Sequence, residues 1–257
     1  MSHNHFNPNR FTDSAGVPWQ GRAFEANPFA DDDGTARTEL IQAIEKFHGS
    51  GDPTAVFDEF CKSRLLIPLV AALGESDEGA NGLKVDKSAE LSIVTVSAPD
   101  GATALPVFSS VQAMAAWNPS ARPVPADAVR VALAAASEGN TRVVLDPTSA
   151  TEFVFRRPAI AAIAQSQSWL APHLDANLRA QIISAANLHG IVGIALSTGD
   201  PKSRLQGAEL LIELSITAGL RKSELDELLS EVATAISAIP DIHARVDEMR
   251  FVLKSVS

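Results

Sequence analysis

The chain is poor in cysteine and in positive charge, and it has no long apolar run. Its single cysteine, Cys61, rules out an internal disulfide framework and fits a reducing compartment. Lys and Arg number 21 against 31 Asp and Glu, and the net charge of -10 argues against non-specific binding to nucleic acid or to anionic membranes. No window approaches the roughly 18 uninterrupted apolar residues of a membrane span, and the first residues lack the basic and apolar segments of a secretory signal. We therefore expect a cytoplasmic protein that binds neither nucleic acid nor membrane.

A recognisable catalytic motif is also missing. Ser149, Asp146 and His173 are the residue types of a hydrolase triad, but the sequence has no Gly-x-Ser-x-Gly turn to expose a serine nucleophile. Cys61 follows two phenylalanines in a helical pattern, with His48 nearby in sequence, and we expect it to behave as a small hydrophobic residue. We therefore expect no enzymatic activity and assign no catalytic residue.

Motifs for metals and cofactors are missing as well. His3 and His5 would leave coordination positions of a metal ion unfilled, and the acidic stretch 31–34 lacks the alternating ligands and distant glutamate of an EF-hand. The glycines within 190–193 and 199–202 lack the spacing of a phosphate-binding loop, so we expect them in strands and turns. The sequence predicts no metal site and no cofactor.

The patterns that are present indicate an arm followed by two folded units. Residues 1–37 are polar and are interrupted by prolines and glycines, which favours an extended arm. Residues 38–167 and 173–257 each combine helical and strand periodicities. This order predicts an α+β fold with two α+β domains, each a mostly antiparallel or mixed sheet with packed helices.

The first domain is expected to contain a hairpin that leads into a helix over 91–117. Helical patterns cover 39–47, 53–60, 111–117, 126–136 and a segment from 157, and strand patterns cover 65–70, 91–97, 105–108, 142–145 and 152–155. Turn chemistry at 99–101 joins the two hairpin strands, and Ser109 or Ser110 would cap the helix. Pro68 removes a donor from its strand, which favours an edge or a bulge.

The second domain is expected to be an antiparallel sheet with helices on one face. Helical patterns cover 175–189 and 223–239, and strand patterns cover 192–196, 210–216 and 249–253. In the helix over 126–136 of the first domain, the spacing places Val129, Leu133 and Ala136 on one side.

Large aromatic residues in irregular segments are the candidates for an interface. They are Trp19, Phe24, Phe29 and Trp117, the last at the end of the expected hairpin helix. Such side chains often anchor contacts with a partner protein. The alternative is that they cover the core of their own chain.

A basic group is the candidate for a ligand contact. Arg156 and Arg157, with Arg64 or Arg142, could bind a carboxylate or a phosphate. The alternative is that these arginines pair with the many acidic residues of the chain itself.

Several stretches resemble the SseB-like family, in the form found in actinobacteria. The similarity covers nearly the whole chain and is carried by 13–19, 27–29, 32–34, Ser63-Arg64-Leu65-Leu66-Ile67-Pro68, 99–110, Trp117 and Val144-Leu145-Asp146-Pro147. In the second half, Gly207-Ala208-Glu209-Leu210 and Arg245-Val246-Asp247 are similar to an SseB-like carboxy-terminal domain. The resemblance implies a cytoplasmic regulatory or protein-binding module and transfers no catalytic residue.

We therefore expect a non-catalytic module that binds an unidentified protein partner through the arm and the hairpin region. The competing hypothesis is an enzyme or a sensor of a small anionic molecule, with Arg64, Arg156 and Arg157 in a pocket between the domains. A third hypothesis is a homodimer in which 249–253 forms an edge strand that pairs across a two-fold axis.

Overall fold

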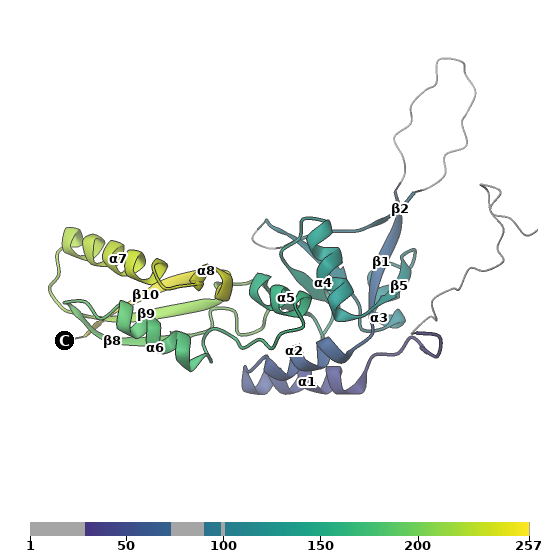
Figure 1. The fold of residues 1–257 in the computed structure, drawn as a ribbon, viewed down its shortest axis with the longest axis horizontal. Coiled ribbons are helices and arrows are strands. Elements are labelled where there is room, and N and C mark those ends of the chain that lie inside the picture. Colours follow the sequence, from purple (N-terminus) through teal and green to yellow (C-terminus); the bar gives the residue numbers. More distant parts are fainter. Residues whose placement is uncertain (1–28, 73–89, 99–100, 257) are drawn as a thin grey trace, which may run out of the picture. The chain divides into compact units, whose positions relative to one another are not determined.

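The computed structural model describes residues 29–72, 90–98 and 101–256, and it has helices and strands along both halves of the chain (Figure 1). The first half contains α1 (Thr38–Ser50), α2 (Thr54–Lys62), β1 (Leu65–Ala72), β2 (Glu90–Ile93), β3 (Val96–Ser97), β4 (Thr103–Val107), α3 (Val111–Trp117), β5 (Arg122–Ala126), α4 (Ala128–Ser137), β6 (Val143–Leu145), β7 (Phe153–Phe155) and α5 (Arg157–Ala164). The second half contains α6 (Ala176–Ala185), β8 (Ile191–Ser197), β9 (Leu210–Thr217), α7 (Lys222–Ser237), α8 (Ile242–Arg245) and β10 (Met249–Val256). The predicted α+β class is confirmed.

The described strands form three sheets. Their orders are β2-β1-β5, β3-β4-β6-β7 and β10-β9-β8. The first sheet is antiparallel, whereas the second is mixed because β4 and β6 run parallel. The third is also mixed, since β10 runs parallel to β9 and β8 antiparallel to it. The prediction of mostly antiparallel or mixed sheets is confirmed. The narrower expectation of an antiparallel sheet over 173–257 is wrong for β10, because α7 carries the chain back before β10 begins.

The predicted hairpin is confirmed for its second part only. β3 and β4 pair antiparallel, and the Ser110 hydroxyl accepts a hydrogen bond from Ala113 N at 3.0 Å, which caps α3. The predicted strand 91–97 is divided, because regular pairing stops at 94–95 and β2 joins β1 in another sheet. Turn residues 99 and 100 lie outside the described residues.

Pro68 lies in the central strand of its sheet, where the sequence favours an edge or a bulge. β2 pairs only with residues Leu69 to Ala72 of β1, so Pro68 lies beyond the end of that ladder. On its other side it is opposite Pro123 of β5. The missing N–H of Pro68 is tolerated because β2 does not extend far enough to pair with this residue, although β1 as a whole is a central strand.

The first hydrophobic core is rich in aromatic side chains. Phe153 packs edge-on against Phe47 with ring centroids 5.1 Å apart, and Phe155 packs against Phe60 at 4.2 Å. α4 contributes mainly small residues to this core, whereas Leu133 is 55% exposed. The side on which the sequence places Leu133 is therefore not the buried side of α4, which is formed by Ala128, Val131, Ala132 and Ala135.

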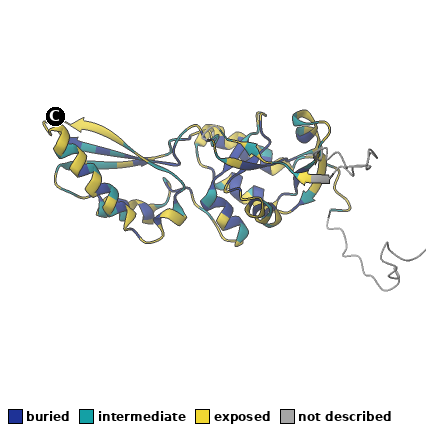
Figure 2. Cartoon of the chain, turned by 90° about the horizontal axis from the view of Figure 1, so that it is seen from above, coloured by how far each residue is buried: buried dark blue, intermediate teal, exposed yellow. Residues whose placement is uncertain are grey.

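The second hydrophobic core lies between one face of the sheet β10-β9-β8 and the helices α6 and α7. Alternate residues of β9, from Leu210 to Ile216, are buried against Leu178 and Ile182 of α6 and Val232 of α7. The predicted period of two in this strand is thus confirmed. Exposure increases along β10 toward the end marked C (Figure 2). Among the described residues, no helix is long and apolar enough to cross a membrane.

Candidate functional site

Three arginines of the first half gather at one end of β6 and β7. Val143 and Phe155 pair across these strands, and Arg142 directly precedes the first whereas Arg156 directly follows the second. An antiparallel pair therefore brings the two arginines to the same end of the sheet. Arg156 is also the N-cap residue of α5, and Arg157 is the first residue of that helix.

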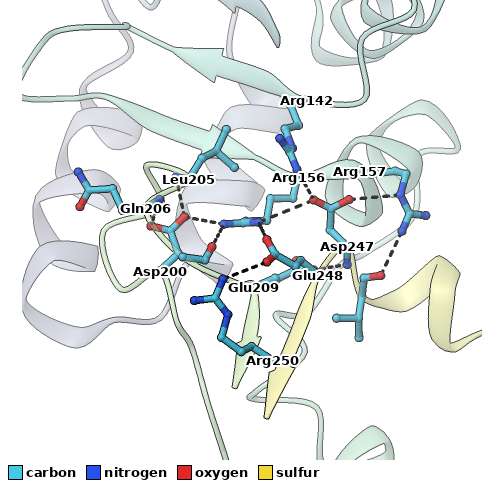
Figure 3. A network of polar contacts seen from close by, with 12 residues as sticks. Arg142, Arg156, Arg157, Asp200, Leu205, Gln206, Glu209, Asp247, Glu248 and Arg250 are labelled. Atoms are coloured by element: carbon cyan, nitrogen blue, oxygen red, sulfur yellow. Dashed lines mark hydrogen bonds and ion pairs between the residues drawn. The ribbon is translucent and has the colours of Figure 1, made fainter. Parts of the chain in front are cut away.

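Arg156 is buried and is enclosed by carboxylates from the second half of the chain (Figure 3). Its Nη2 donates to Asp200 Oδ2 at 2.9 Å and to the carbonyl oxygen of Gly207. Its Nη1 lies 3.7 Å from Asp247 Oδ2 and 4.0 Å from Glu248 Oε2. The guanidinium is thus held by internal partners, as the alternative reading of the sequence predicts.

Asp247 accepts from the other two arginines. Arg142 Nη2 lies 3.2 Å from Asp247 Oδ2, and Arg157 Nε lies 3.3 Å from Asp247 Oδ1. Arg157 also donates to the carbonyl oxygen of Val246 at 3.1 Å. The side chain of Asp247 is only 9% exposed, so its charge is largely screened from water and is balanced by these cations.

Asp200 organises the loop between β8 and β9 as well as binding Arg156. Its carboxylate accepts from the backbone N–H groups of Arg204, Leu205 and Gln206, at 3.1, 2.7 and 3.3 Å. The loop closes where the backbones of Gly199 and Gly207 meet, because a Cβ on Gly207 would lie 2.2 Å from the Gly199 carbonyl oxygen. Gly199 and Gly207 therefore serve the close approach of the two ends of this loop.

Glu209 is the titratable group of this cluster that the sequence reading does not identify. Burial raises the pKa of Glu209 to about 7, although the Asp247 N–H that donates to it at 2.6 Å and the charge of Arg156 both act in the opposite direction. The signal in the sequence is a glutamate directly before the apolar strand β9. We define the arginine–carboxylate cluster as Arg142, Arg156, Arg157, Asp200, Glu209 and Asp247.

A cavity beside this cluster is too small for a metabolite. It is lined by Arg156, Asp200, Glu209, Trp169 and His173, among others, and its volume is about 40 Å³. Ligand pockets typically measure about 300–1,000 Å³. Burial also lowers the pKa of His173, although the charge of Asp52 opposes this effect. The lining combines these polar groups with a larger apolar part that includes Phe153 and Phe155, and the space has room for little more than water.

Arg64 lies apart from the arginine–carboxylate cluster in its contacts. It donates to the carbonyl oxygen of Thr35 at 2.6 Å and to that of Ser109 at 3.0 Å. The structure therefore brings Arg156 and Arg157 together, whereas Arg64 joins the segment before α1, at Thr35, to the loop before α3, at Ser109.

Of the four aromatic interface candidates, the structure describes Phe29 and Trp117 only. Trp19 and Phe24 lie outside the described residues, and Phe29 is half-buried. Trp117 packs against Phe108 with ring centroids 5.3 Å apart, in a small cluster that includes Leu66. Trp117 thus covers its own domain on at least one side.

The remaining reactive groups have structural partners or are poorly activated. Asp146 is buried and accepts from Ser109 N at 2.8 Å, Ser109 Oγ at 2.6 Å and Thr151 Oγ1 at 2.9 Å, so it fixes a turn. Cys61 is exposed, contrary to the expectation that it packs as a hydrophobic residue, because Phe57 and Phe60 take the buried side of α2. Partial desolvation, with a contribution from Asp58, raises the pKa of the Cys61 thiol and disfavours the nucleophilic thiolate. Over residues 29–72, 90–98 and 101–256, no group of three or more potential metal ligands is present.

The fold and the cluster define an α+β protein in which buried arginines pair with buried carboxylates. Residues 39–162 match the family model described as the SseB protein N-terminal domain, so this segment of the chain is an SseB-like domain. No curated protein and no solved structure matches the chain. Arg142, Arg156 and Arg157 lie within the matched segment, whereas the carboxylates that bind them lie beyond it.

Proposed function

We propose that the chain is a non-catalytic cytoplasmic regulatory module that acts by binding another protein. The observation that carries this proposal is the carboxy-terminal sheet β10-β9-β8, which has α6 and α7 on one face. Four large apolar residues on its two edge strands are exposed by 39% or more of their surface, namely Val192, Val252, Leu253 and Val256. Exposed apolar residues gathered on one element are typical of surfaces that contact proteins.

The other face of this sheet has a mixed, half-exposed surface. Glu213 and Ser215 of β9 are half-buried, and Arg250 and Lys254 of β10 are exposed beside Val252. Apolar residues among charged ones are typical of interfaces that form and dissociate. We therefore propose the carboxy-terminal sheet as the main contact surface, together with the aromatic residues of the arm and Trp117.

The two hydrophobic cores support a division into the domains 38–167 and 173–257, after an arm over 1–37. The first core draws its residues from α1 to α5 and the strands among them, and the second from α6 to β10. We propose that the second unit is the SseB-like carboxy-terminal domain. In this proposal the arginine–carboxylate cluster fixes the two units to each other. A partner bound to one unit is therefore also held at a fixed position relative to the other unit.

The competing function, a sensor or enzyme for a small anion, has less support. A phosphate or carboxylate at Arg156 would have to displace Asp200, whose oxygen lies 2.9 Å from the guanidinium. The adjoining cavity of about 40 Å³ would also have to open. Of the arginines that make an anion site conceivable from the sequence, Arg156 and Arg157 are occupied by carboxylates of the chain, whereas Arg64 donates to backbone carbonyl oxygens.

Affinity capture from a cell lysate with mass spectrometry tests the proposed function. The variants are Val192→Glu on β8 and, as a matched control, Leu133→Glu on α4, because these residues are 58% and 55% exposed. We expect a specific partner whose recovery falls at least tenfold for Val192→Glu and is unchanged for Leu133→Glu. Recovery of no specific partner, combined with thermal stabilisation by a metabolite, would contradict the proposal.

A further inference from the structure

The strand β10 is a long edge strand that pairs on one side. It is bonded to β9 over its whole length, from Met249 opposite Leu210 to Val256 opposite Thr217. In the order β10-β9-β8, no described strand pairs with its other side. The strand contains no proline and no bulge within this register. Such an edge presents backbone donors and acceptors that a further strand can bind.

We infer that β10 pairs antiparallel with β10 of a second copy of the chain, across a two-fold axis centred on Phe251. This inference deepens the proposed function, because it names one protein that the carboxy-terminal sheet binds. It turns the two three-stranded sheets into one continuous sheet, with the helices of both copies on the same side.

Inward-packing and exposed side chains alternate along β10, and this alternation limits the registers in which two copies can pair. Met249 and Phe251 pack on the core between the sheet and its helices, whereas Arg250 and Lys254 are exposed. In a continuous sheet, residues directly opposite each other point to the same face. Residues that pack inward must therefore lie opposite inward-packing residues of the second copy. This holds only when the two-fold axis passes through one residue of β10, which then lies opposite the same residue of the second copy.

The charges of β10 select among these registers. With the axis at Phe251, Glu248 of each copy lies opposite Lys254 of the other, and Arg250 lies opposite Val252. With the axis at Val252, Arg250 of each copy would lie opposite Lys254 of the other, which places like charges together twice. The first register is self-complementary and the second is self-repelling.

Glu248 and Lys254, which the favoured register places opposite each other, are exposed enough to form ion pairs between the two copies. Glu248 is 43% and Lys254 is 65% exposed. Their contacts within the chain are long, at 3.6 Å from Glu248 to Arg250, 4.0 Å from Glu248 to Arg156 and 3.9 Å from Lys254 to Glu213. On the helix side, Met249 would meet Leu253, which is 39% exposed, so the pairing also covers apolar surface.

Disulfide trapping between introduced cysteines in the full-length chain tests directly which residues of the two copies lie opposite each other. The background is Cys61→Ala, and the single variants are Arg250→Cys and Val252→Cys, both at exposed positions. We expect mixing the two variants under mild oxidation to give a covalent dimer several-fold faster than either variant alone. Faster dimer formation by Val252→Cys alone would overturn the register, because it would place the axis at that residue.

Charge exchange with light scattering tests the same contact without a new bond. Glu248→Lys and Lys254→Glu should each weaken dimerisation several-fold, and the double exchange should restore it. Glu138→Lys, at an exposed position on the end of α4, should leave dimerisation unchanged. Failure of the double exchange to restore the dimer would overturn the proposed register.

A molecular mass that stays monomeric at every concentration would overturn the self-pairing itself. This outcome is distinguishable from failure of the proposed function. A monomer that still captures a partner through Val192 overturns only the pairing of β10, whereas a dimer that captures no partner leaves the pairing intact.

Discussion

Arg156 and Asp200 form a buried ion pair with 2.9 Å between Nη2 and Oδ2, and their side chains are 7% and 3% exposed. The pair joins the residue that begins α5 to the loop between β8 and β9. Because both charges are removed from water, each depends on the other for compensation.

Replacing Arg156 should therefore destabilise the protein strongly. Arg156→Met removes the cation and leaves Asp200 buried without its main partner, which we expect to lower the free energy of unfolding by about 3–5 kcal/mol. Urea denaturation followed by circular dichroism measures this value. Arg130→Met is the control, because Arg130 is 64% exposed and pairs with Asp127 at 3.7 Å, so its loss should cost less than about 1 kcal/mol. Equal effects of the two variants would contradict the role of the buried pair.

Glu209 should make stability fall as the pH rises toward neutrality. Its pKa in the folded chain is about 7 against an ordinary value of 4.5, so the folded state holds a proton that the unfolded state has lost between these values. The stabilisation is complete below about pH 4.5 and disappears as the pH passes about 7, with a span of roughly 3 kcal/mol. The measurement is the free energy of unfolding from pH 4.5 to pH 8 for the wild type and for Glu209→Gln.

The glutamine variant keeps an oxygen that can accept from Asp247 N but carries no titrating proton. Relative to it, the wild type should lose stability with rising pH. Asp175 should act in the opposite sense at lower pH, because its hydrogen bonds to Leu178 N and Arg245 lower the pKa of that carboxyl. Identical pH profiles of the wild type and Glu209→Gln would contradict the raised pKa of Glu209.

The loop between β8 and β9 should not tolerate a side chain at Gly207. A Cβ there would lie 2.2 Å from a backbone oxygen, so Gly207→Ala must displace the loop that holds Asp200. We expect a loss of at least 2 kcal/mol, in order of magnitude, in the free energy of unfolding. Gly49→Ala is the matched control, because a Cβ at Gly49 meets nothing within 4 Å inside α1 and should stabilise the helix by up to about 1 kcal/mol. A neutral Gly207→Ala would contradict the close approach.

Much of the local structure follows from the sequence. Asp175 begins α6 by accepting from Asn177 N and Leu178 N, and Ser110 begins α3 in the same way. Both caps are readable because a side chain bonds to backbone only two or three residues away. The alternating residues of β9 are likewise predicted, since one buried face imposes its period on the strand.

Other elements depend on contacts between distant segments. β5 is not among the strands predicted from the sequence. Its segment contains Pro123 and Pro125, and the strand depends on pairing with β1, where Pro68 lies opposite Pro123. The split of 91–97 depends on competition between two sheets. Neither outcome is contained in the local pattern of residues.

The arginine–carboxylate cluster was predictable only as one of two alternatives. The sequence shows that Arg156 and Arg157 are adjacent and that acids are abundant, which favours internal pairing. It does not select Asp247, because 105 residues separate Arg142 from that partner. The raised pKa of Glu209 depends on burial, which arises only when β9 and β10 meet the first core's arginines.

Hydrogen exchange of the chain with and without its captured partner tests the central claim most directly. The claim is that the carboxy-terminal sheet binds a protein. We predict that amide exchange in β8 slows at least tenfold in the complex, while exchange in α1 and α4 is unchanged. Protection confined to the segment 39–162, with β8 exchanging as in the free chain, would contradict the claim.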